Sequence, residues 1–317
     1  MKMLATRDGY GAALASLGEK YDFYVFDADL SKTTKTDAFK EKFPDRFFSA
    51  GIAEANMMGM AAGFAACGKT VFATTFAIFA AGRAFEQVRN SIAYTNLNVK
   101  VVGTHAGILI GEDGASHQAI EDIALMRSIP NMTVLCPSDY TQSIACVEEA
   151  IKHQGPVYLR FGRNPSPIIY EKSEFEIGKG HVLKDGSDLT IVAIGDMVFE
   201  ALEAAKLLEE ENISTAVIDM PSIKPIDKEL ILKYAKKTGL IVTSEDHNIM
   251  GGLGSAVCEV LAEKFQSEYR IPVIRTGVKD VFGRSGKKDD LAKFYGLNAE
   301  RIKISCKQAF VNMANSL

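Results

Sequence analysis

A single acid stands in an otherwise uncharged stretch of the chain. Glu54 is the only acid between Gly51 and Cys67, and it precedes a run of small residues. An isolated carboxylate at such a position is either the partner of a helix dipole or a catalytic group with a shifted pKa. Because the following residues lack bulk and charge, we expect their helix to pack closely against other backbone.

Two phenylalanines follow a short buried strand that we expect over 70–74. Phe76 and Phe79 are three residues apart at the exit of that strand. Such a pair could form a wall for an aromatic ligand, although core packing is the more common role of paired phenylalanines. The two residues alone leave both interpretations open.

A glycine-rich loop over 103–118 gathers two histidines and two acids. His105 lies near its start, Glu112 and Asp113 in its middle, and His117 near its end. Glycine lets the backbone approach a ligand, and polar side chains on loops are poor candidates for core. Because the spacing matches no common zinc pattern, we predict no metal ligands here and favour the binding of a sugar.

Two further motifs follow expected strands. Arg163 comes after the strand 157–160, where its planar guanidinium could donate two hydrogen bonds to one phosphate. Surface arginines are common and usually inert, so this residue alone does not define a site. Farther along, 243–248 precedes the glycines of 251–254. This stretch lacks the spacing of a dinucleotide fingerprint, so we favour an interface or structural role for it.

The elements that must position these residues alternate between buried strands and helices. In the first half we expect strands over 23–26, 70–74, 99–103, 132–135 and 157–160, and helices near 6–18, 53–67, 80–94, 117–128 and 140–152. Continuous apolar strands separated by helices are typical of a parallel sheet that is covered on both faces.

The same alternation restarts after a segment that contains prolines, glycines and charges. There we expect strands over 189–195, 215–219, 240–243 and 271–274, and helices over 196–210, 227–237 and 251–265. The sequence therefore predicts an α/β protein of two domains, each a mostly parallel sheet flanked by helices. We expect these domains at 1–170 and 188–317, with a linker at 171–187.

Composition limits the function classes. The chain has 317 residues, a hydrophobic share of 47% and a formal net charge of −4, which indicates a globular protein without a basic block for nucleic acid. No apolar run reaches the length of a membrane span, and the N-terminus does not have the pattern of a signal peptide. Five cysteines without paired spacing suit a reducing compartment, so we expect a cytoplasmic protein.

Taken in order, many segments of the chain resemble transketolase. The order and spacing agree over nearly the whole sequence, the second domain included. The matching segments are 26–30, 44–47, 51–57, 75–76, 84–89, 111–114, 121–122, 127–130 and 137–139.

The resemblance covers only part of the family's architecture. Transketolases have a diphosphate-binding domain, a pyrimidine-binding domain and a C-terminal domain, and this chain is similar to the last two. The family's Gly-Asp-Gly motif with its downstream Asn is not found in the sequence. The resemblance thus implies one subunit of a split transketolase, whose N-terminal partner subunit carries the diphosphate site. It further implies a two-plus-two complex, sugar phosphate substrates, and thiamine diphosphate with Mg²⁺ (or Ca²⁺) held mainly by the partner.

The resemblance also implies roles toward the cofactor. Glu54 would bond the pyrimidine N1′ nitrogen and favour the tautomer whose N4′ nitrogen takes a proton from the thiazolium ring. Phe76 and Phe79 would line the pyrimidine pocket, and Asp29 and Leu30 would lie beside the cofactor. Glu54, His105 and His117 are the expected catalytic residues.

A second set of residues would bind the sugar. The resemblance implies that Asp113, His105 and His117 bond its hydroxyls or its reacting oxygen. The phosphate would be held by Arg163, together with Arg7 and Thr33.

Other functions remain open for this layout. The β subunit of a 2-oxoacid dehydrogenase has a similar length and glutamate, but the 111–114 loop with His117 favours the sugar enzyme. A 1-deoxyxylulose-5-phosphate synthase is disfavoured by 110–114 and 120–122. A non-catalytic assembly subunit is disfavoured because Glu54, His105, Asp113 and Arg163 are all present.

Overall fold

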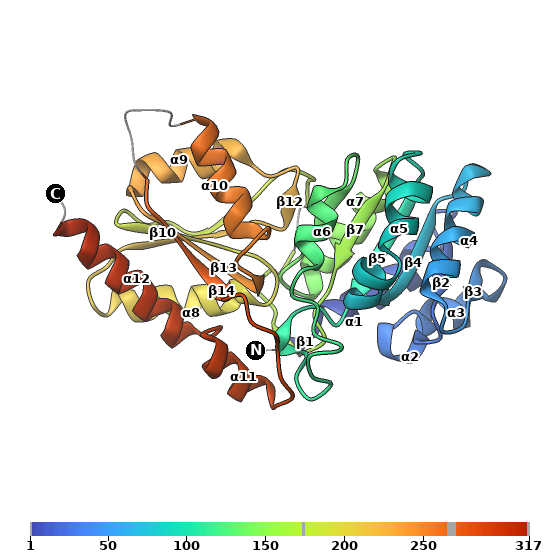
Figure 1. Cartoon of the computed structure of the whole chain (residues 1–317), viewed down its shortest axis with the longest axis horizontal. Helices are drawn as coiled ribbons and strands as arrows, with labels where there is room; N and C mark the ends of the chain where they lie inside the picture. Colours follow the sequence, from blue (N-terminus) through green and yellow to red (C-terminus); the bar gives the residue numbers. More distant parts are fainter. Residues whose placement is uncertain (1, 173–174, 265–270, 316–317) are drawn as a thin grey trace.

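The computed structural model describes residues 2–172, 175–264 and 271–315. The chain forms two α/β domains that lie side by side (Figure 1). Each has a mostly parallel sheet flanked by helices, so the predicted fold class is confirmed. No helix in the described ranges combines the length and apolar character of a membrane span.

The first domain is built on a seven-stranded sheet. Its order is β12-β6-β7-β5-β4-β2-β3, and every pairing is parallel except that of β12 with β6. The strands are β2 (Tyr24–Asp27), β3 (Phe47–Ser49), β4 (Val71–Phe76), β5 (Val99–Thr104), β6 (Thr133–Leu135), β7 (Val157–Arg160) and β12 (Ser222–Lys224). All residues of β4 and β5 are buried, as expected for central strands covered on both faces.

Helices cover both faces of this sheet. On one face, α1 packs against α7 over a core that contains Tyr10, Phe72 and Leu159. On the other face lie α4, the segment from η2 to η3, and α6. The elements are α1 (Thr6–Leu17), α2 (Ser31–Thr34), α3 (Asp37–Lys42), η1 (Pro44–Arg46), α4 (Glu54–Ala66), η2 (Phe79–Arg83), α5 (Phe85–Gln87), η3 (Val88–Ala93), η4 (Ile108–Ile110), α6 (Asp122–Ser128) and α7 (Tyr140–Lys152). A small ribbon of β1 (Met3–Leu4) and β8 (Ser166–Pro167) joins the ends of the domain.

The second domain is built on a five-stranded sheet of order β14-β13-β10-β11-β9, in which only β9 is antiparallel. In Figure 1, α9 and α10 cover one face of this sheet and α8 and α12 the other. The elements are β9 (His181–Lys184), β10 (Leu189–Ala193), α8 (Met197–Glu209), β11 (Thr215–Asp219), α9 (Lys228–Thr238), β13 (Ile241–Asn248), α10 (Leu253–Lys264), β14 (Val273–Val278), α11 (Lys288–Tyr295) and α12 (Ala299–Ala314).

Three local predictions need correction. Residues 80–94 are not one α-helix, because π-helical turns η2 and η3 flank the short α5. The helix expected over 117–128 begins only at Asp122. The segment expected as a linker at 171–187 contains β9. This strand lies at the edge of its sheet, where a strand is not buried on both faces and its sequence need not be continuously apolar. For the helix expected over 251–265, residue 265 lies outside the described residues.

Candidate active site

The residues singled out from the sequence lie around one end of the first sheet. Asp29 and Leu30 follow β2, Phe76 ends β4, His105 follows β5, and Arg163 follows β7. These strands are neighbours in the order β7-β5-β4-β2 and run parallel. Parallel strands present their carboxyl ends at one edge, where open α/β sheets bind ligands.

Glu54 is the first residue of α4, and its side chain is 3% exposed. A buried carboxylate needs a charged or hydrogen-bonding partner, and Arg83 supplies one. The Arg83 Nη1 donates to the two carboxylate oxygens over 3.0 and 2.9 Å. The same guanidinium lies 4.2 Å from the centre of the Phe79 ring and stays half exposed.

The sequence analysis did not assign a role to Arg83. The signal was available, because Arg83 is the only cation between Lys69 and Arg89, just as Glu54 is the only acid in its own stretch. Pairing the two charges required knowing that α4 and η2 are packed together.

Four rings meet at the ends of β4 and β5. Phe76 and Phe79 are stacked with centroids 5.9 Å apart, and the His105 ring lies 4.0 Å from that of Phe76. His117 meets Phe79 edge-on at 5.4 Å. The pair of phenylalanines therefore extends into a cluster with both candidate histidines, in which Phe76 is buried and Phe79 is half-buried.

His105 is held in one protonation state. Arg7 Nη1 lies 2.8 Å from the His105 Nε2, and since an arginine only donates, that nitrogen accepts. The remaining proton is then on Nδ1, which lies 2.9 Å from the Thr104 hydroxyl. Burial, reinforced by the positive charges of Arg7 and Arg163, lowers the pKa of His105 to about 3. The ring is therefore neutral at neutral pH.

The three residues expected at the sugar phosphate are positioned from different elements. Arg7, in the first turn of α1, donates to the Thr33 carbonyl over 3.0 Å as well as to His105. Arg163 pairs with Asp113 over 2.8 Å and donates to the Ile110 carbonyl over 3.1 Å. Arg7 and Arg163 both act electrostatically on His105, which makes this corner of the site cationic.

Asp29 and Leu30 occupy a tight turn directly after β2, the strand that pairs with β4. Asp29 is exposed at a φ of 65°, and the Leu30 N–H donates to the buried Asp27 carboxylate over 2.5 Å. Among the described contacts, none joins Asp29 or Leu30 to the four rings. Within the same described ranges, no three His, Cys, Asp or Glu side chains are grouped as a metal site would require.

Comparison with known proteins identifies the family of the two domains. The model of the transketolase pyrimidine binding domain matches residues 2–167, and that of the transketolase C-terminal domain matches residues 178–302. A Methanocaldococcus jannaschii protein described as a transketolase C-terminal section is 53% identical over 300 residues, covering 93% of each chain. The 6-deoxy-6-sulfo-D-fructose transketolase subunit SqwH of Clostridium sp. is 43% identical, covering 93% of this chain and 91% of that protein.

The solved structures give the same result. A split gene transketolase, determined as an inactive beta4 tetramer, superposes with a TM-score of 0.90 at 53% identity. The match covers 97% of this chain and 99% of that one. This chain therefore belongs to the transketolase family and carries the pyrimidine-binding and C-terminal domains of that family.

Proposed function

We propose that this chain is the C-terminal subunit of a split, thiamine-diphosphate-dependent transketolase that transfers a two-carbon ketol unit between sugar phosphates. The observation that carries the proposal is the buried Glu54 carboxylate at the start of α4, linked through Arg83 to the aromatic cluster. A single buried carboxylate near stacked rings offers the hydrogen-bond acceptor and the aromatic contacts that an aminopyrimidine requires.

The residues present fit the pyrimidine half of thiamine diphosphate. Glu54 would accept a hydrogen bond at N1′, Phe76 and Phe79 would contact the ring, and Asp29 and Leu30 would border it. When bound, the cofactor supplies the carbon nucleophile that receives the two-carbon unit. No Gly-Asp-Gly motif is present for its diphosphate, so we assign that group and its Mg²⁺ (or Ca²⁺) mainly to a partner subunit.

The remaining residues would bind the sugar. His105, as a neutral ring, would form a hydrogen bond with the reacting oxygen, and His117 lies beside the same aromatic wall. Asp113 would accept hydrogen bonds from sugar hydroxyls. Arg163 and Arg7, with Thr33, would surround the phosphate, because guanidinium groups recognise tetrahedral anions well.

The assembly is part of the proposal. The N-terminal partner subunit would close the site, and two copies of each subunit would form a two-plus-two complex around a two-fold axis. A relative of this chain was solved as an inactive tetramer of one subunit type, which agrees with an incomplete site. All five cysteines are free, which suits a reducing cytoplasm.

The test compares this chain, its partner and their mixture. We expect ketol transfer only from the mixture, with thiamine diphosphate and Mg²⁺ present, and a two-plus-two mass by light scattering. Because SqwH is a 6-deoxy-6-sulfo-D-fructose transketolase subunit, the substrate panel includes sulfonated as well as phosphorylated ketoses. Full activity from this chain alone would overturn the proposal.

A further inference from the structure

The second domain contacts the loop that carries the expected sugar-binding residues. This substrate loop, Gly107–Gln118, begins two residues after His105 and includes Asp113 and His117. It has one short 3-10 turn, η4, and changes direction at Gly111 and Gly114, both at positive φ. A loop with so little regular structure needs outside contacts to keep its side chains in place.

Asp246, on β13 of the second domain, provides the first of these contacts. Its carboxylate accepts the backbone N–H groups of Ile108 over 2.9 Å and of Leu109 over 3.1 Å. Asp246 is 6% exposed, so water does not compete strongly for these bonds. Hydrogen bonds to an ionised acceptor are about twice as strong as neutral ones.

The backbone of the loop is adapted to this carboxylate. Gly107 has a φ of 85°, and a Cβ atom built at that position would collide with the Asp246 carboxylate. Glycine is therefore required at the start of the loop both for its conformation and for the close approach of Asp246.

Two more contacts reach the loop from the segment after β14. Gln118, 3% exposed, donates from its Nε2 to the Ile108 carbonyl and to the Arg284 carbonyl of the second domain, each over 3.0 Å. The Ser285 hydroxyl donates to the Glu112 carbonyl over 2.6 Å. The start, middle and end of the loop are thus all bonded to the second domain.

Asp246 is itself fixed by the first domain. Arg160 donates from Nη2 to the Asp246 carbonyl over 2.9 Å and forms a buried ion pair with Asp122 over 2.8 Å. This pair links the end of β7 and the start of α6 to β13. The position of Asp246 relative to the substrate site is therefore fixed both by its own strand in the second domain and by Arg160 of the first domain.

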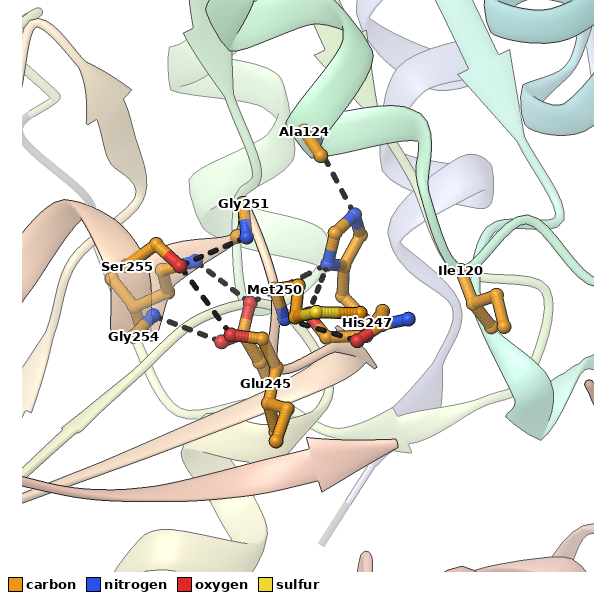
Figure 2. Close-up of polar contacts among 12 residues, drawn as sticks. Ile120, Ala124, Glu245, His247, Met250, Gly251, Gly254 and Ser255 are labelled. Carbon is orange, nitrogen blue, oxygen red and sulfur yellow. Dashed lines mark hydrogen bonds and ion pairs between the residues drawn. The ribbon is translucent and has the colours of Figure 1, made fainter. Parts of the chain in front are cut away.

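The neighbouring residues of β13 have a different role. Glu245 accepts the N–H groups of Leu253 and Gly254 at the start of α10, and His247 accepts the Ala124 N–H of α6 (Figure 2). Successive side chains of a strand point to opposite faces, so Glu245 and His247 share one face and Asp246 uses the other. Glu245 is thus a matched control for Asp246.

We propose that the C-terminal domain positions the substrate loop, and that Asp246 is the principal positioning residue. The proposal rests on the proposed function, since it gives the domain a role at the sugar-binding side of that site. For the 243–248 motif, the sequence indicated only an interface or structural role. The proposal gives this motif a specific contact, that of Asp246 with the substrate loop. Asp246 touches neither cofactor nor substrate and acts through the backbone of the loop.

The experiment uses Asp246→Asn in the complex with the partner subunit and thiamine diphosphate. An amide is neutral and has only one oxygen to accept the two N–H groups. We expect the KM for sugar substrates to rise about tenfold, the scale of one lost charge-assisted hydrogen bond. Cofactor affinity and complex mass should be unchanged, and hydrogen exchange should accelerate over 108–118.

The controls separate positioning from general damage. Glu245→Gln should leave the KM and the loop exchange as in the wild type. Should Asp246→Asn not fold, Ser285→Ala replaces it, because this exposed residue can lose its hydroxyl without unfolding the domain, and loop exchange should again accelerate. Unchanged loop exchange and KM in the folded variant would overturn the proposal, as would equal effects of Glu245→Gln.

The failure of the proposed function gives a different result. If the wild-type complex transfers no two-carbon unit, the assigned reaction is wrong. Hydrogen exchange in Asp246→Asn requires no turnover, so it still decides whether Asp246 orders the loop.

Discussion

At the scale of single residues, the site depends on charges that are paired across distant segments. Glu54 could be selected from the sequence because it is isolated in an apolar stretch, and the structure shows it buried with Arg83. The pairing has a consequence for the proposed function, since the carboxylate must exchange Arg83 for the pyrimidine when the cofactor binds.

Glu54→Ala should abolish ketol transfer by the complex while leaving the chain folded. We expect a loss of several powers of ten in kcat, because proton transfer within the cofactor depends on this carboxylate. Arg83 is half exposed and can be solvated once its partner is gone. The measurement is steady-state turnover, with Glu203→Ala, at a 37% exposed side chain on α8, as control. Near-normal turnover in Glu54→Ala would refute the role of Glu54.

Arg83→Met should destabilise the isolated chain by about 1–2 kcal/mol. It leaves the buried Glu54 carboxylate without its cation, and the half-exposed position of Arg83 keeps the effect below that of a fully buried pair. Urea unfolding measures the change. The double variant with Glu54→Gln should recover most of the lost stability, whereas additive losses would show that the two side chains act independently.

Arg163→Ala should raise the KM for phosphorylated sugars about ten- to hundredfold, and much less for unphosphorylated analogues. A charge-assisted bond to phosphate contributes about 1.5–3 kcal/mol. A smaller rise in KM is expected for both substrate classes, because Arg163 also pairs with Asp113 and donates to the Ile110 carbonyl. Arg275→Ala, in the second domain, is the matched control. Equal effects on both substrate classes would show that Arg163 does not bind phosphate.

At the scale of elements, apolar runs predicted the central strands well. The strand 215–219 and the helix 140–152 have the expected bounds, because their burial pattern is set locally. Edge strand β9 and the π-helical turns were not predicted, since neighbours far along the chain determine them. The same distinction holds for the site. Glu54 and His105 could be selected from the sequence, whereas the roles of Arg83 and Asp246 depend on neighbours that only the packed fold brings together.

Strand β13 should make stability depend on pH. Burial raises the pKa of Glu245 from its ordinary 4.5 to about 7. The folded chain then holds a proton that the unfolded chain has released, so this residue's contribution to stability falls as pH rises from about 4.5 to about 7. The loss is up to about 3 kcal/mol.

Glu245→Gln isolates this contribution. Its amide does not titrate, and its single oxygen can accept from one of the two N–H groups of Leu253 and Gly254. Burial lowers the pKa of His247 to about 4, and this opposes the trend of Glu245 in both proteins. Urea unfolding below pH 4.5 and above pH 7 should therefore show the free energy of unfolding of Glu245→Gln rising relative to that of the wild type as pH rises. A constant difference between them would contradict the prediction.

At the scale of the whole molecule, one face of α4 is left without cover. Asn56, Gly59, Met60 and Gly63 are exposed on this helix, and the nearby Ile52 is 77% exposed. Cβ atoms placed at Gly59 and Gly63 would meet nothing within 4 Å. Within the chain these glycines therefore serve no packing purpose, which favours a face built for another subunit.

Gly63→Gln should weaken assembly and leave the fold of the isolated chain intact. A residue other than glycine favours the helix by about 0.5–1 kcal/mol, so unfolding of the chain alone should become slightly harder. Light scattering of the mixture with the partner should show fewer two-plus-two complexes. Gly239→Gln is no suitable control because of its φ of 71°. The control is Lys206→Gln, at a 65% exposed side chain on α8 of the second domain. Unchanged assembly would show that this face lies outside the interface.

The strand β12 has a consequence for any attempt to divide the chain. It follows β11 of the second domain, yet it pairs with β6 at the edge of the first sheet, and Lys224 donates to the carbonyls of Arg127 and Ile129. Scission between the sheets, near residue 175, would therefore not release two complete halves. The N-terminal fragment would carry a bare β6 edge, open to pairing with other chains and hence to aggregation. Proteolysis there should yield a nicked protein whose fragments stay associated until denaturant is added.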